Sequence, residues 1–332
     1  MTRSAFIIGG TGQIGIATAA ELLRHGWRVK LGYTGTRGAQ NIPIDADPVT
    51  VDRRDTGALL AAIGTTDLLI DTMAFTARDA DQLAGLASQY GRLCVISSAS
   101  VYADDHGRSL ETAGTIGFPD YPVPIPETQA LVAPGPDSYS SNKVELEQRL
   151  LATATRPLSI VRPCAVHGIN SKHPREWWLL KRMLDGRTRI PLAGDGESIF
   201  HTSATVNIAA LIRTVADASG THILNAADPT APTLRAIGEI IAAQTGWTGE
   251  FVGVPMDSTI GQTPFSTPSP VVVSMAAAES LGYVPAGNYA ETIVPYVEWM
   301  RSHAGDWQTA FPMFGKYPSD PFDYAAEQAI IG

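Results

Sequence analysis

The sequence is poor in several features that would point to particular classes of protein. Its 332 residues include only two cysteines, Cys94 and Cys164, and each lies among apolar neighbours. We therefore expect two small core residues, with neither a disulfide framework nor a cysteine-based metal site. No apolar run approaches the roughly 18 residues that a membrane-spanning helix needs. A strand-like run begins at Ser4, which leaves no room for a signal peptide, so we expect a cytoplasmic protein.

Basic residues are also outnumbered and scattered. The 24 lysines and arginines face 33 aspartates and glutamates, the formal net charge is −9, and no basic block occurs. This pattern disfavours nucleic acid as a partner, because neutralising phosphates requires clustered cations. The composition, with 44% hydrophobic and 17% charged residues, is that of a soluble protein with a sizeable core. We expect its partner to be a small-molecule substrate.

Short apolar runs alternate with helical patterns through the first half of the chain. This alternation predicts an α/β fold with a doubly wound, parallel, Rossmann-type sheet, and such sheets bind ligands at the carboxyl edge of their strands. The predicted strands are Ser4–Ile8, Trp27–Leu31, Val49–Val51, Leu68–Ile70, Leu93–Ser97 and Leu158–Pro163, with a late strand at His222–Ala226.

Two domains are expected. A dinucleotide-binding domain covers residues 1–165, and the chain returns to it at about 204–226. A smaller, mostly helical substrate domain covers 166–332, with helices predicted at Leu234–Thr245 and Val271–Leu281. The proline-rich stretch from Asp104 to Ser138 is a long irregular loop, and its part at 119–126 is either a lid over the site or a surface loop.

The first motif that carries chemistry is a glycine-rich turn. It follows the first strand and precedes an apolar helical run, with glycines at Gly9, Gly12 and Gly15. A strand, a glycine turn and a helix form the arrangement that binds the pyrophosphate of a dinucleotide, because helix-start N–H groups lack intrahelical partners. The alternative is a structural turn. The candidate cofactor contacts here are Gly9, Thr11, Gly12, Gln13, Ile14 and Gly15.

The second motif pairs Tyr139 with Lys143. Residues four apart share one face of a helix, and a nearby ammonium lowers the pKa of a phenol. The pair could then exchange a proton with an alcohol or ketone while hydride moves to or from a nicotinamide. The alternative is an ordinary tyrosine beside a solvated lysine. Ser98, at the end of the fifth strand, could orient the reacting oxygen or simply cap a helix.

Taken together and in this order, these motifs resemble the extended short-chain dehydrogenase/reductase superfamily, in its NAD(P)-dependent epimerase/dehydratase group, from residue 1 to about 226. The resemblance implies that Ser98, Tyr139 and Lys143 are catalytic. It also implies a homodimer through the helix that bears Tyr139 and its neighbour. The further cofactor contacts that it implies are Asp52, Arg53, Met73, Ala74, Tyr139, Lys143, Pro163 and Val166.

The chain departs from that family at three places. Tyr33 stands where NAD-preferring members carry an acidic residue, and the nearby Arg37 could pair with a 2′-phosphate, so we expect NADP, with NAD as the alternative. Phe200 stands where nucleotide-sugar members carry an arginine for the diphosphate. Ala99 and Ser100 replace the Asp-Glu pair of the dehydratases, which argues against elimination chemistry.

The candidate substrate contacts are Ser100, His167, Trp177, Phe200 and His201. Each histidine could equally be a hydrogen-bonded structural residue, and Trp177 could belong to the core. We predict an NAD(P)-dependent oxidoreductase acting on a secondary alcohol or ketone, with sugar-like molecules among the candidates. The alternatives are an epimerase that oxidises a sugar or nucleotide sugar transiently, and a non-catalytic NADP-sensing protein.

Overall fold

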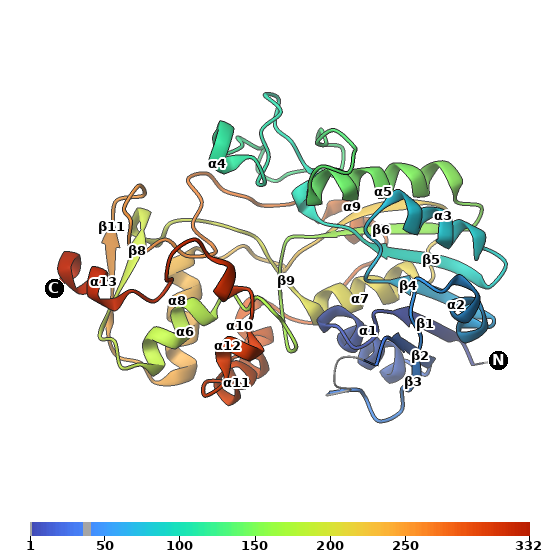
Figure 1. Cartoon of the computed structure of the whole chain (residues 1–332), viewed down its shortest axis with the longest axis horizontal. Helices are drawn as coiled ribbons and strands as arrows, with labels where there is room; N and C mark the ends of the chain where they lie inside the picture. Colours follow the sequence, from blue (N-terminus) through green and yellow to red (C-terminus); the bar gives the residue numbers. More distant parts are fainter. Residues whose placement is uncertain (1, 36–40) are drawn as a thin grey trace. The chain divides into compact units, whose positions relative to one another are not determined.

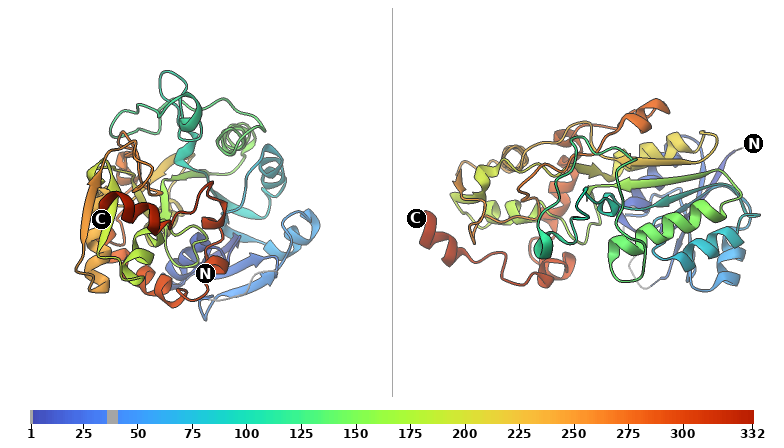
Figure 2. Two further views of the ribbon diagram at one scale, coloured as in Figure 1. Left: turned by 60° about the vertical axis from the view of Figure 1, so that its left-hand side comes forward. Right: turned by 90° about the horizontal axis from the view of Figure 1, so that it is seen from above.

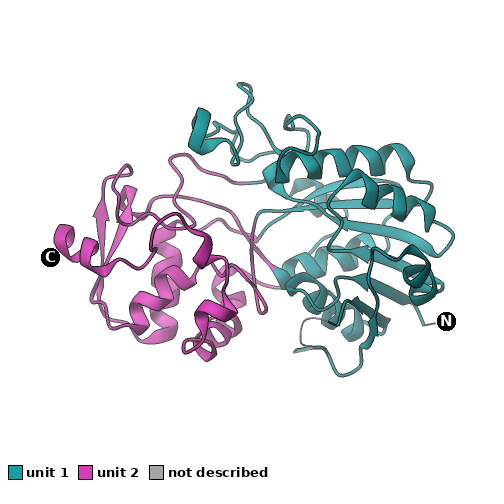
Figure 3. Ribbon diagram, in the orientation of Figure 1, with its two compact units in different colours: residues 1–164, 205–227, 273–286 teal, residues 165–204, 228–272, 287–332 magenta. Residues whose placement is uncertain are grey.

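The computed structural model describes residues 2–35 and 41–332. The chain divides into two compact units (Figure 3). Unit 1 contains residues up to 164 together with 205–227 and 273–286. Unit 2 contains residues 165–204, 228–272 and 287–332.

Unit 1 is built on a seven-stranded sheet in the order β10-β6-β5-β4-β1-β2-β3, and all of its pairings are parallel (Figure 1). This arrangement confirms the predicted doubly wound, Rossmann-type fold. The strands are β1 (Ser4–Ile8), β2 (Arg28–Tyr33), β3 (Asp47–Thr50), β4 (Thr66–Asp71), β5 (Tyr90–Ile96), β6 (Leu158–Pro163) and β10 (His222–Ala226).

Helices cover both faces of this sheet, which is why its central strands are continuous apolar runs. Helices α2, α3 and α5 pack on one face, where they share a hydrophobic core with β1, β4, β5 and β6 (Figure 2). Helices α1 and α7 pack together on the other face. The helices of unit 1 are α1 (Gln13–Arg24), α2 (Thr56–Ile63), α3 (Ala77–Gly85), η1 (Ala99–Val101), α4 (Ala113–Ile116), α5 (Tyr139–Thr153), α7 (Thr205–Val215) and α9 (Ala276–Ser280).

A buried ion pair joins α5 to the sheet. Arg162 in β6 donates to Glu147 of α5 through Nε, at 3.0 Å, and through Nη2, and both side chains are almost fully buried. Glu147 also accepts a hydrogen bond from the hydroxyl of Ser97, the residue after β5. The helix that bears Tyr139 is therefore anchored to two strands.

The sheet order determines where a ligand would bind. The chain runs outward in opposite directions from β1, through β2 on one side and β4 on the other, so the strand order reverses between β1 and β4. Ligands of such sheets bind at the carboxyl ends of the strands beside this reversal. The glycine turn after β1 and the loop after β4 both lie there.

Unit 2 is formed by helices around an aromatic core and by two parallel strand pairs, β8 with β11 and β7 with β9. Arg182 of α6 holds the C-terminal tail, donating to Glu327 and to the Pro321 carbonyl. The helices are α6 (Trp177–Leu184), η2 (Gly194–Gly196), α8 (Leu234–Thr245), α10 (Tyr289–Thr292), α11 (Val294–Ser302), α12 (Trp307–Ala310), η3 (Phe314–Lys316) and α13 (Tyr324–Ile331). The strands are β7 (Ala165–His167), β8 (Arg189–Ala193), β9 (Thr202–Ala204) and β11 (Glu250–Val254).

The predicted helix at Val271–Leu281 is wrong over its first half. Val271 and Val273 form isolated β-bridges, with Phe200 and Ile125 respectively, and helix α9 begins only at Ala276. The three consecutive valines at 271–273 favour extended backbone, since β-branched side chains pack well on a pleated surface. No helix among the described residues has both the length and the apolar character to cross a membrane.

Candidate active site

The turn between β1 and α1 requires glycine at two of its three predicted positions for reasons internal to the chain. Gly9 has a φ of 77°, and a Cβ atom there would lie 2.4 Å from side-chain atoms of Met73 and Thr72. A Cβ atom at Gly15 would lie 2.6 Å from the carbonyl oxygen of Gly9 and 2.7 Å from that of Gly10. Both glycines therefore permit close packing at the end of β1.

At Gly12, packing within the chain does not require glycine. It is exposed, its φ of −76° suits any residue, and a Cβ atom there would meet only the Gly9 carbonyl oxygen, at 3.3 Å. Gly12 caps α1, and no described side chain caps that end of the helix. The N–H groups of the first turn can therefore bind an external anion. Together with the half-buried Thr11, Gln13 and Ile14, this surface fits the pyrophosphate of a dinucleotide.

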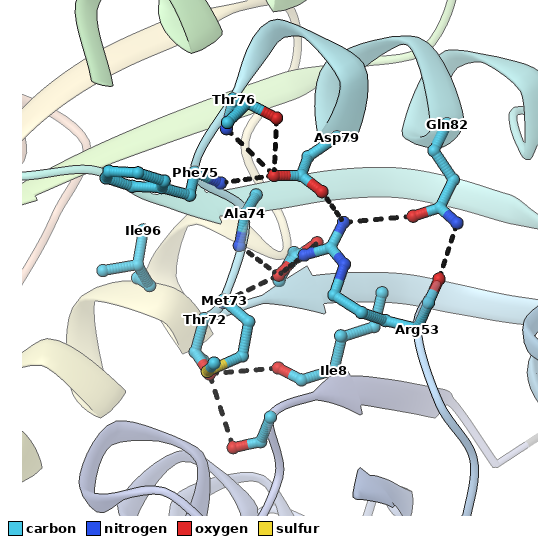
Figure 4. A network of polar contacts seen from close by, with 12 residues as sticks. Ile8, Arg53, Thr72, Met73, Ala74, Phe75, Thr76, Asp79, Gln82 and Ile96 are labelled. Carbon is cyan, nitrogen blue, oxygen red and sulfur yellow. Dashed lines mark hydrogen bonds and ion pairs between the residues drawn. The ribbon is translucent and has the colours of Figure 1, made fainter. Parts of the chain in front are cut away.

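The loop after β4 is held beside this turn by a buried carboxylate (Figure 4). Asp71 ends β4, has no exposed surface, and accepts hydrogen bonds from the N–H groups of Met73, at 2.7 Å, and Ala74, at 2.8 Å. The Thr72 hydroxyl donates to the Ile8 carbonyl at 3.0 Å. Because Met73 is 53% exposed and Ala74 is buried, Met73 is the member of this predicted pair that presents its side chain to a ligand.

A second carboxylate and an arginine complete the network. Asp79 in α3 accepts hydrogen bonds from the N–H groups of Phe75 and Thr76, at 2.8 and 2.9 Å. Arg53 lies 2.9 Å from Asp71 Oδ2 and 3.2 Å from Asp79 Oδ1 (Figure 4). The guanidinium is therefore engaged inside the protein, and a contact between Arg53 and a cofactor stays a prediction for its backbone.

Asp52 is the residue predicted to contact the adenine of the cofactor. Its carboxylate accepts hydrogen bonds from the backbone N–H of Arg54 at 2.9 Å and from Nη2 at 2.7 Å. These hydrogen bonds lower the pKa of Asp52 to about 2. An ionised, partly exposed carboxylate retains lone pairs that could accept from an adenine amino group. Tyr33 ends β2 half-buried, and Arg37 lies outside the described residues.

The three predicted catalytic residues lie within unit 1 at the carboxyl edge of the sheet. Ser98 follows β5, and its hydroxyl accepts a hydrogen bond from the N–H of Ser100 at 3.1 Å, so it also caps η1. Tyr139 is the first residue of α5, and Lys143 lies one turn further on, with its Nζ 5.9 Å from the centre of the Tyr139 ring. The ring of Phe75, from the loop after β4, lies 5.5 Å from that of Tyr139.

The pKa of the Tyr139 phenol is shifted in the direction opposite to the predicted one. Partial burial raises its pKa, a hydrogen bond with Ser98 lowers it, and the carboxylate of Glu111 raises it. The sequence analysis expected Lys143 to lower this pKa. The ammonium is instead bound to backbone carbonyls, its Nζ lies 5.9 Å from the ring centre, and Lys143 does not contribute to the shift, so that expectation is wrong.

Lys143 is buried and engaged with two strand ends. Its Nζ donates to the carbonyls of Ala74, at 2.7 Å, and Ile96, at 3.0 Å. Burial lowers its pKa to about 8, although Asp71 and Glu147 oppose this shift. The group is still mainly protonated at neutral pH. An ammonium has three donors, so these hydrogen bonds leave one for a ligand hydroxyl.

Glu111 is a residue of this site that the sequence analysis missed. It comes from the proline-rich loop, and its carboxylate accepts hydrogen bonds from the N–H groups of Tyr139, at 3.0 Å, and Ser140, at 3.1 Å, and from the Ser138 hydroxyl, at 2.6 Å. An anion at a helix N-terminus is stabilised by the helix dipole. The loop therefore helps to fix the start of the helix that bears Tyr139.

The network residues Asp71 and Asp79 were also missed. An acidic residue that ends the apolar run Leu68–Ile70 was a usable signal for Asp71, because such a residue is buried only with partners. Asp79 lies in a capping-box position after Thr76, which marks a helix start but not a role in the site. Of the other candidates in unit 1, Ser100 is half-buried in η1 and Pro163 is buried at the end of β6.

The remaining candidates belong to unit 2, where two of them share one internal partner. His167 Nε2 lies 2.9 Å from Asp228 Oδ2, and His201 Nε2 lies 2.9 Å from the Asp228 carbonyl oxygen. Both histidines are almost fully buried, with exposed fractions of 1% and 4%. These contacts support the structural alternative that the sequence analysis left open for each.

Trp177 is a correction. Its ring lies 5.1 Å from that of Phe311 in the aromatic core of unit 2 and is 1% exposed, so it has no surface on which a substrate could stack. Phe200 and Val166 are half-buried in unit 2, and their predicted contacts stay predictions. Among the described residues, no group of three or more histidine, cysteine or acidic side chains is placed to hold a metal ion.

No protein-family model and no curated protein sequence matches the chain. Solved structures do resemble it. A UDP-glucose 4-epimerase from Thermotoga maritima, crystallised with UDP-glucose, has a TM-score of 0.68 and 17% identity, over 90% of this chain and 99% of its own. A UDP-N-acetylglucosamine 4-epimerase from Methanobrevibacter ruminantium M1 has a TM-score of 0.70 and 16% identity, over 91% and 99%.

A dTDP-glucose 4,6-dehydratase from Bacillus anthracis str. Ames, in complex with NAD, has a TM-score of 0.67 and 16% identity, over 93% of this chain and all of its own. Identities this low establish likeness of fold. The chain thus has the fold of these epimerases and of this dehydratase, which agrees with the fold that its motifs indicated.

Proposed function

We propose that this chain is a nicotinamide-dinucleotide-dependent enzyme that oxidises a secondary alcohol of a sugar-like substrate and returns the hydride within the same turnover, as an epimerase. The observation that carries the proposal is the placement of Ser98, Tyr139 and Lys143 at the sheet edge that also bears the uncapped start of α1. A non-catalytic sensor would have no use for a phenol and an ammonium held together beside a dinucleotide.

The residues of unit 1 divide the work of such a reaction. A bound nicotinamide dinucleotide would supply a reversible acceptor for the hydride of the substrate carbon. Tyr139 takes the proton of the substrate hydroxyl at its phenolic oxygen and returns it. Ser98 donates a hydrogen bond to the reacting oxygen and so orients it. Lys143 offers its remaining donor to a ribose hydroxyl.

The proposed cofactor contacts follow from the same geometry. The start of α1 at Gly12 would hold the pyrophosphate, Asp52 would face the adenine, and Met73 would line the nucleotide between them. Tyr33 leaves no carboxylate at the end of β2 to repel a 2′-phosphate, which supports NADP, whereas several solved structures of similar fold, the dehydratase among them, hold NAD. We propose NADP, and a comparison of the two dissociation constants by calorimetry decides between them.

The proposed substrate is a sugar-like molecule without a nucleoside diphosphate. The epimerases of similar fold were solved with UDP-linked ligands. Here Phe200 stands where nucleotide-sugar enzymes carry an arginine, and an aromatic ring cannot neutralise a diphosphate. This observation also keeps a net reductase as the second candidate. A homodimer through α3 and α5 remains a prediction, and light scattering on the purified protein tests it.

A substrate panel with a hydride label tests the proposal. The purified protein is incubated with NAD or NADP, each in its oxidised and in its reduced form, and with free sugars, sugar phosphates and UDP-sugars, and the products are identified by NMR. An epimerase gives an epimer without net change in nicotinamide absorbance, and a substrate deuterated at the reacting carbon keeps its deuterium. A net reductase consumes reduced cofactor stoichiometrically. Absence of both reactions, in protein shown to bind a dinucleotide, refutes the proposal.

A further inference from the structure

The segment between β4 and α3 is held at each backbone N–H from residue 72 to residue 76 (Figure 4). The N–H of Thr72 donates to the Ile8 carbonyl at 3.1 Å. Those of the next two residues donate to Asp71, at 2.7 and 2.8 Å, and those of the two after them donate to Asp79, at 2.8 and 2.9 Å. Within this segment no peptide group can turn over without breaking a hydrogen bond.

The peptide group between Ala74 and Phe75 connects this segment to Lys143. Its N–H donates to Asp79 at 2.8 Å, and its carbonyl oxygen accepts a hydrogen bond from Lys143 Nζ at 2.7 Å. Because a peptide group is planar, fixing the N–H also fixes the direction of the carbonyl. The preceding peptide group is fixed in the same way through the Ala74 N–H and Asp71. The two carboxylates thus determine where the carbonyl that holds the ammonium lies.

The guanidinium of Arg53 compensates the negative charge of the two carboxylates, Asp71 and Asp79. Asp71 has no exposed surface, and an uncompensated charge there would be strongly destabilising. The guanidinium lies 2.9 Å from Asp71 and 3.2 Å from Asp79, and it donates to Gln82 at 3.1 Å. Gln82 in turn donates to the Arg53 carbonyl at 2.6 Å. With Lys143, the cluster holds two cations and two carboxylates, so its charge balances.

We propose that Asp71, Asp79 and Arg53 are positioning residues for Lys143. They hold the Ala74–Phe75 peptide in the one orientation in which its carbonyl receives the ammonium, and they thereby set the place from which Lys143 acts on the cofactor ribose. This inference rests on the function proposed above. It adds that Arg53, on the segment after β3, acts on the catalytic helix through a chain of hydrogen bonds within unit 1.

An NMR titration tests the positioning without requiring turnover. The chain has five lysines, so protein labelled with ¹³C at lysine Cε gives few signals, and Lys143→Arg assigns the one that matters. The charges that face Lys143 are Asp71, Asp79, Glu147 and Arg53. Asp71→Asn removes an anion and should lower the pKa of Lys143 by about half a pH unit or more. Arg53→Met should raise it.

The sign of the Asp71→Asn shift separates positioning from damage. A loosened fold would expose Lys143 and raise its pKa toward the ordinary value. A pKa that rises, or stays unchanged, in folded Asp71→Asn protein therefore overturns the inference. If Asp71→Asn does not fold, Arg53→Met and Arg53→Lys are titrated instead. A lysine cannot bridge two carboxylates as a guanidinium does, so both variants should change the Lys143 signal.

Kinetics test the consequence for catalysis. Asp71→Asn should lower kcat roughly 10- to 100-fold, with the dissociation constant for the dinucleotide changed less than about threefold, because misplacing a catalytic group affects the reaction more than binding. The double variant Arg53→Met/Asp71→Asn should be no slower than the slower single variant, since both act through one peptide group. If the losses in kcat of the two single variants multiply in the double variant, the residues act independently and the inference is contradicted.

Arg149→Met is the matched control. It removes another arginine–aspartate pair between α5 and α3, with Asp81, but both side chains are about half exposed. We expect wild-type kcat and an unchanged Lys143 titration. A loss equal to that of Asp71→Asn would show that any pair between these helices matters, and would overturn the inference. If no hydride transfer is found with any substrate, the proposed function fails, while the NMR titration still decides the positioning of Lys143.

Discussion

Replacing Gly12 with alanine tests whether this glycine is needed for dinucleotide binding. Gly9 and Gly15, in contrast, are needed for the packing of the chain itself. A Cβ atom at Gly12 would meet one heavy atom, the Gly9 carbonyl oxygen at 3.3 Å, and the backbone there suits any residue. Alanine is a poorer N-cap by about 0.5–1 kcal/mol, and a stiffer unfolded chain offsets part of this loss. The free energy of unfolding should therefore change by less than about 1 kcal/mol.

The effect on binding should be larger. The added methyl group would lie where phosphate oxygens approach the first N–H groups of α1, and each charge-assisted hydrogen bond contributes about 1.5–3 kcal/mol. The dissociation constant should rise about 10- to 100-fold, which calorimetry with NAD and NADP measures. Urea denaturation measures the stability of the same preparations.

Gly15→Ala is the matched control for this prediction. Its methyl group would lie 2.6 and 2.7 Å from two backbone oxygens, so we expect a stability loss of about 1–3 kcal/mol. If Gly12→Ala binds the dinucleotide as tightly as the wild type does, the turn is not the pyrophosphate site and the reasoning fails.

Four further predictions follow from the charges of the structure. Lys143 has a pKa of about 8 in the folded protein and about 10.4 in the unfolded chain, so the buried ammonium destabilises the folded state below pH 8. The free energy of unfolding should therefore increase by about 3 kcal/mol as the pH rises from 8 to 10.4. Urea denaturation of wild type against Lys143→Met should show this divergence, and parallel curves would contradict it. Glu111→Gln removes an anion that raises the pKa of Tyr139, so the acid limb of the pH–rate profile should move to lower pH; a shift to higher pH refutes the assignment. Arg162→Met leaves Glu147 buried and unpaired and should cost about 3–5 kcal/mol by denaturation. Arg182→Met removes the contacts that hold the C-terminal tail, so limited proteolysis should cleave that tail first, and wild-type resistance would argue against this anchor.

Much of the fold could be predicted because it is local and strongly patterned. The strand His222–Ala226 and the helix Leu234–Thr245 occur at their predicted bounds, and the apolar runs of the parallel sheet were recognisable without knowing their partners. Strands β7 and β9 of unit 2 were missed because they have three residues each and pair with distant segments. Periodicity needs more residues than that to be measurable.

The candidate site was predictable where chemistry repeats at fixed spacing, as in Tyr139 and Lys143. It was not predictable where a role depends on distant partners. Glu111 lies in a loop without periodic pattern, yet it caps the helix that bears Tyr139. Arg53 was expected at the cofactor because it follows Asp52, but the buried Asp71 and the partly buried Asp79 hold its guanidinium. Only tertiary structure shows which of several possible charges a side chain meets.

The most direct test of the central claim is Tyr139→Phe, which deletes one oxygen at a position about half exposed. The account predicts a dinucleotide dissociation constant within about threefold of wild type, an unchanged melting temperature, and a loss of roughly 100-fold or more in turnover of the substrate found by the panel. Near-normal turnover by this variant would contradict proton transfer at Tyr139, and with it the proposed site.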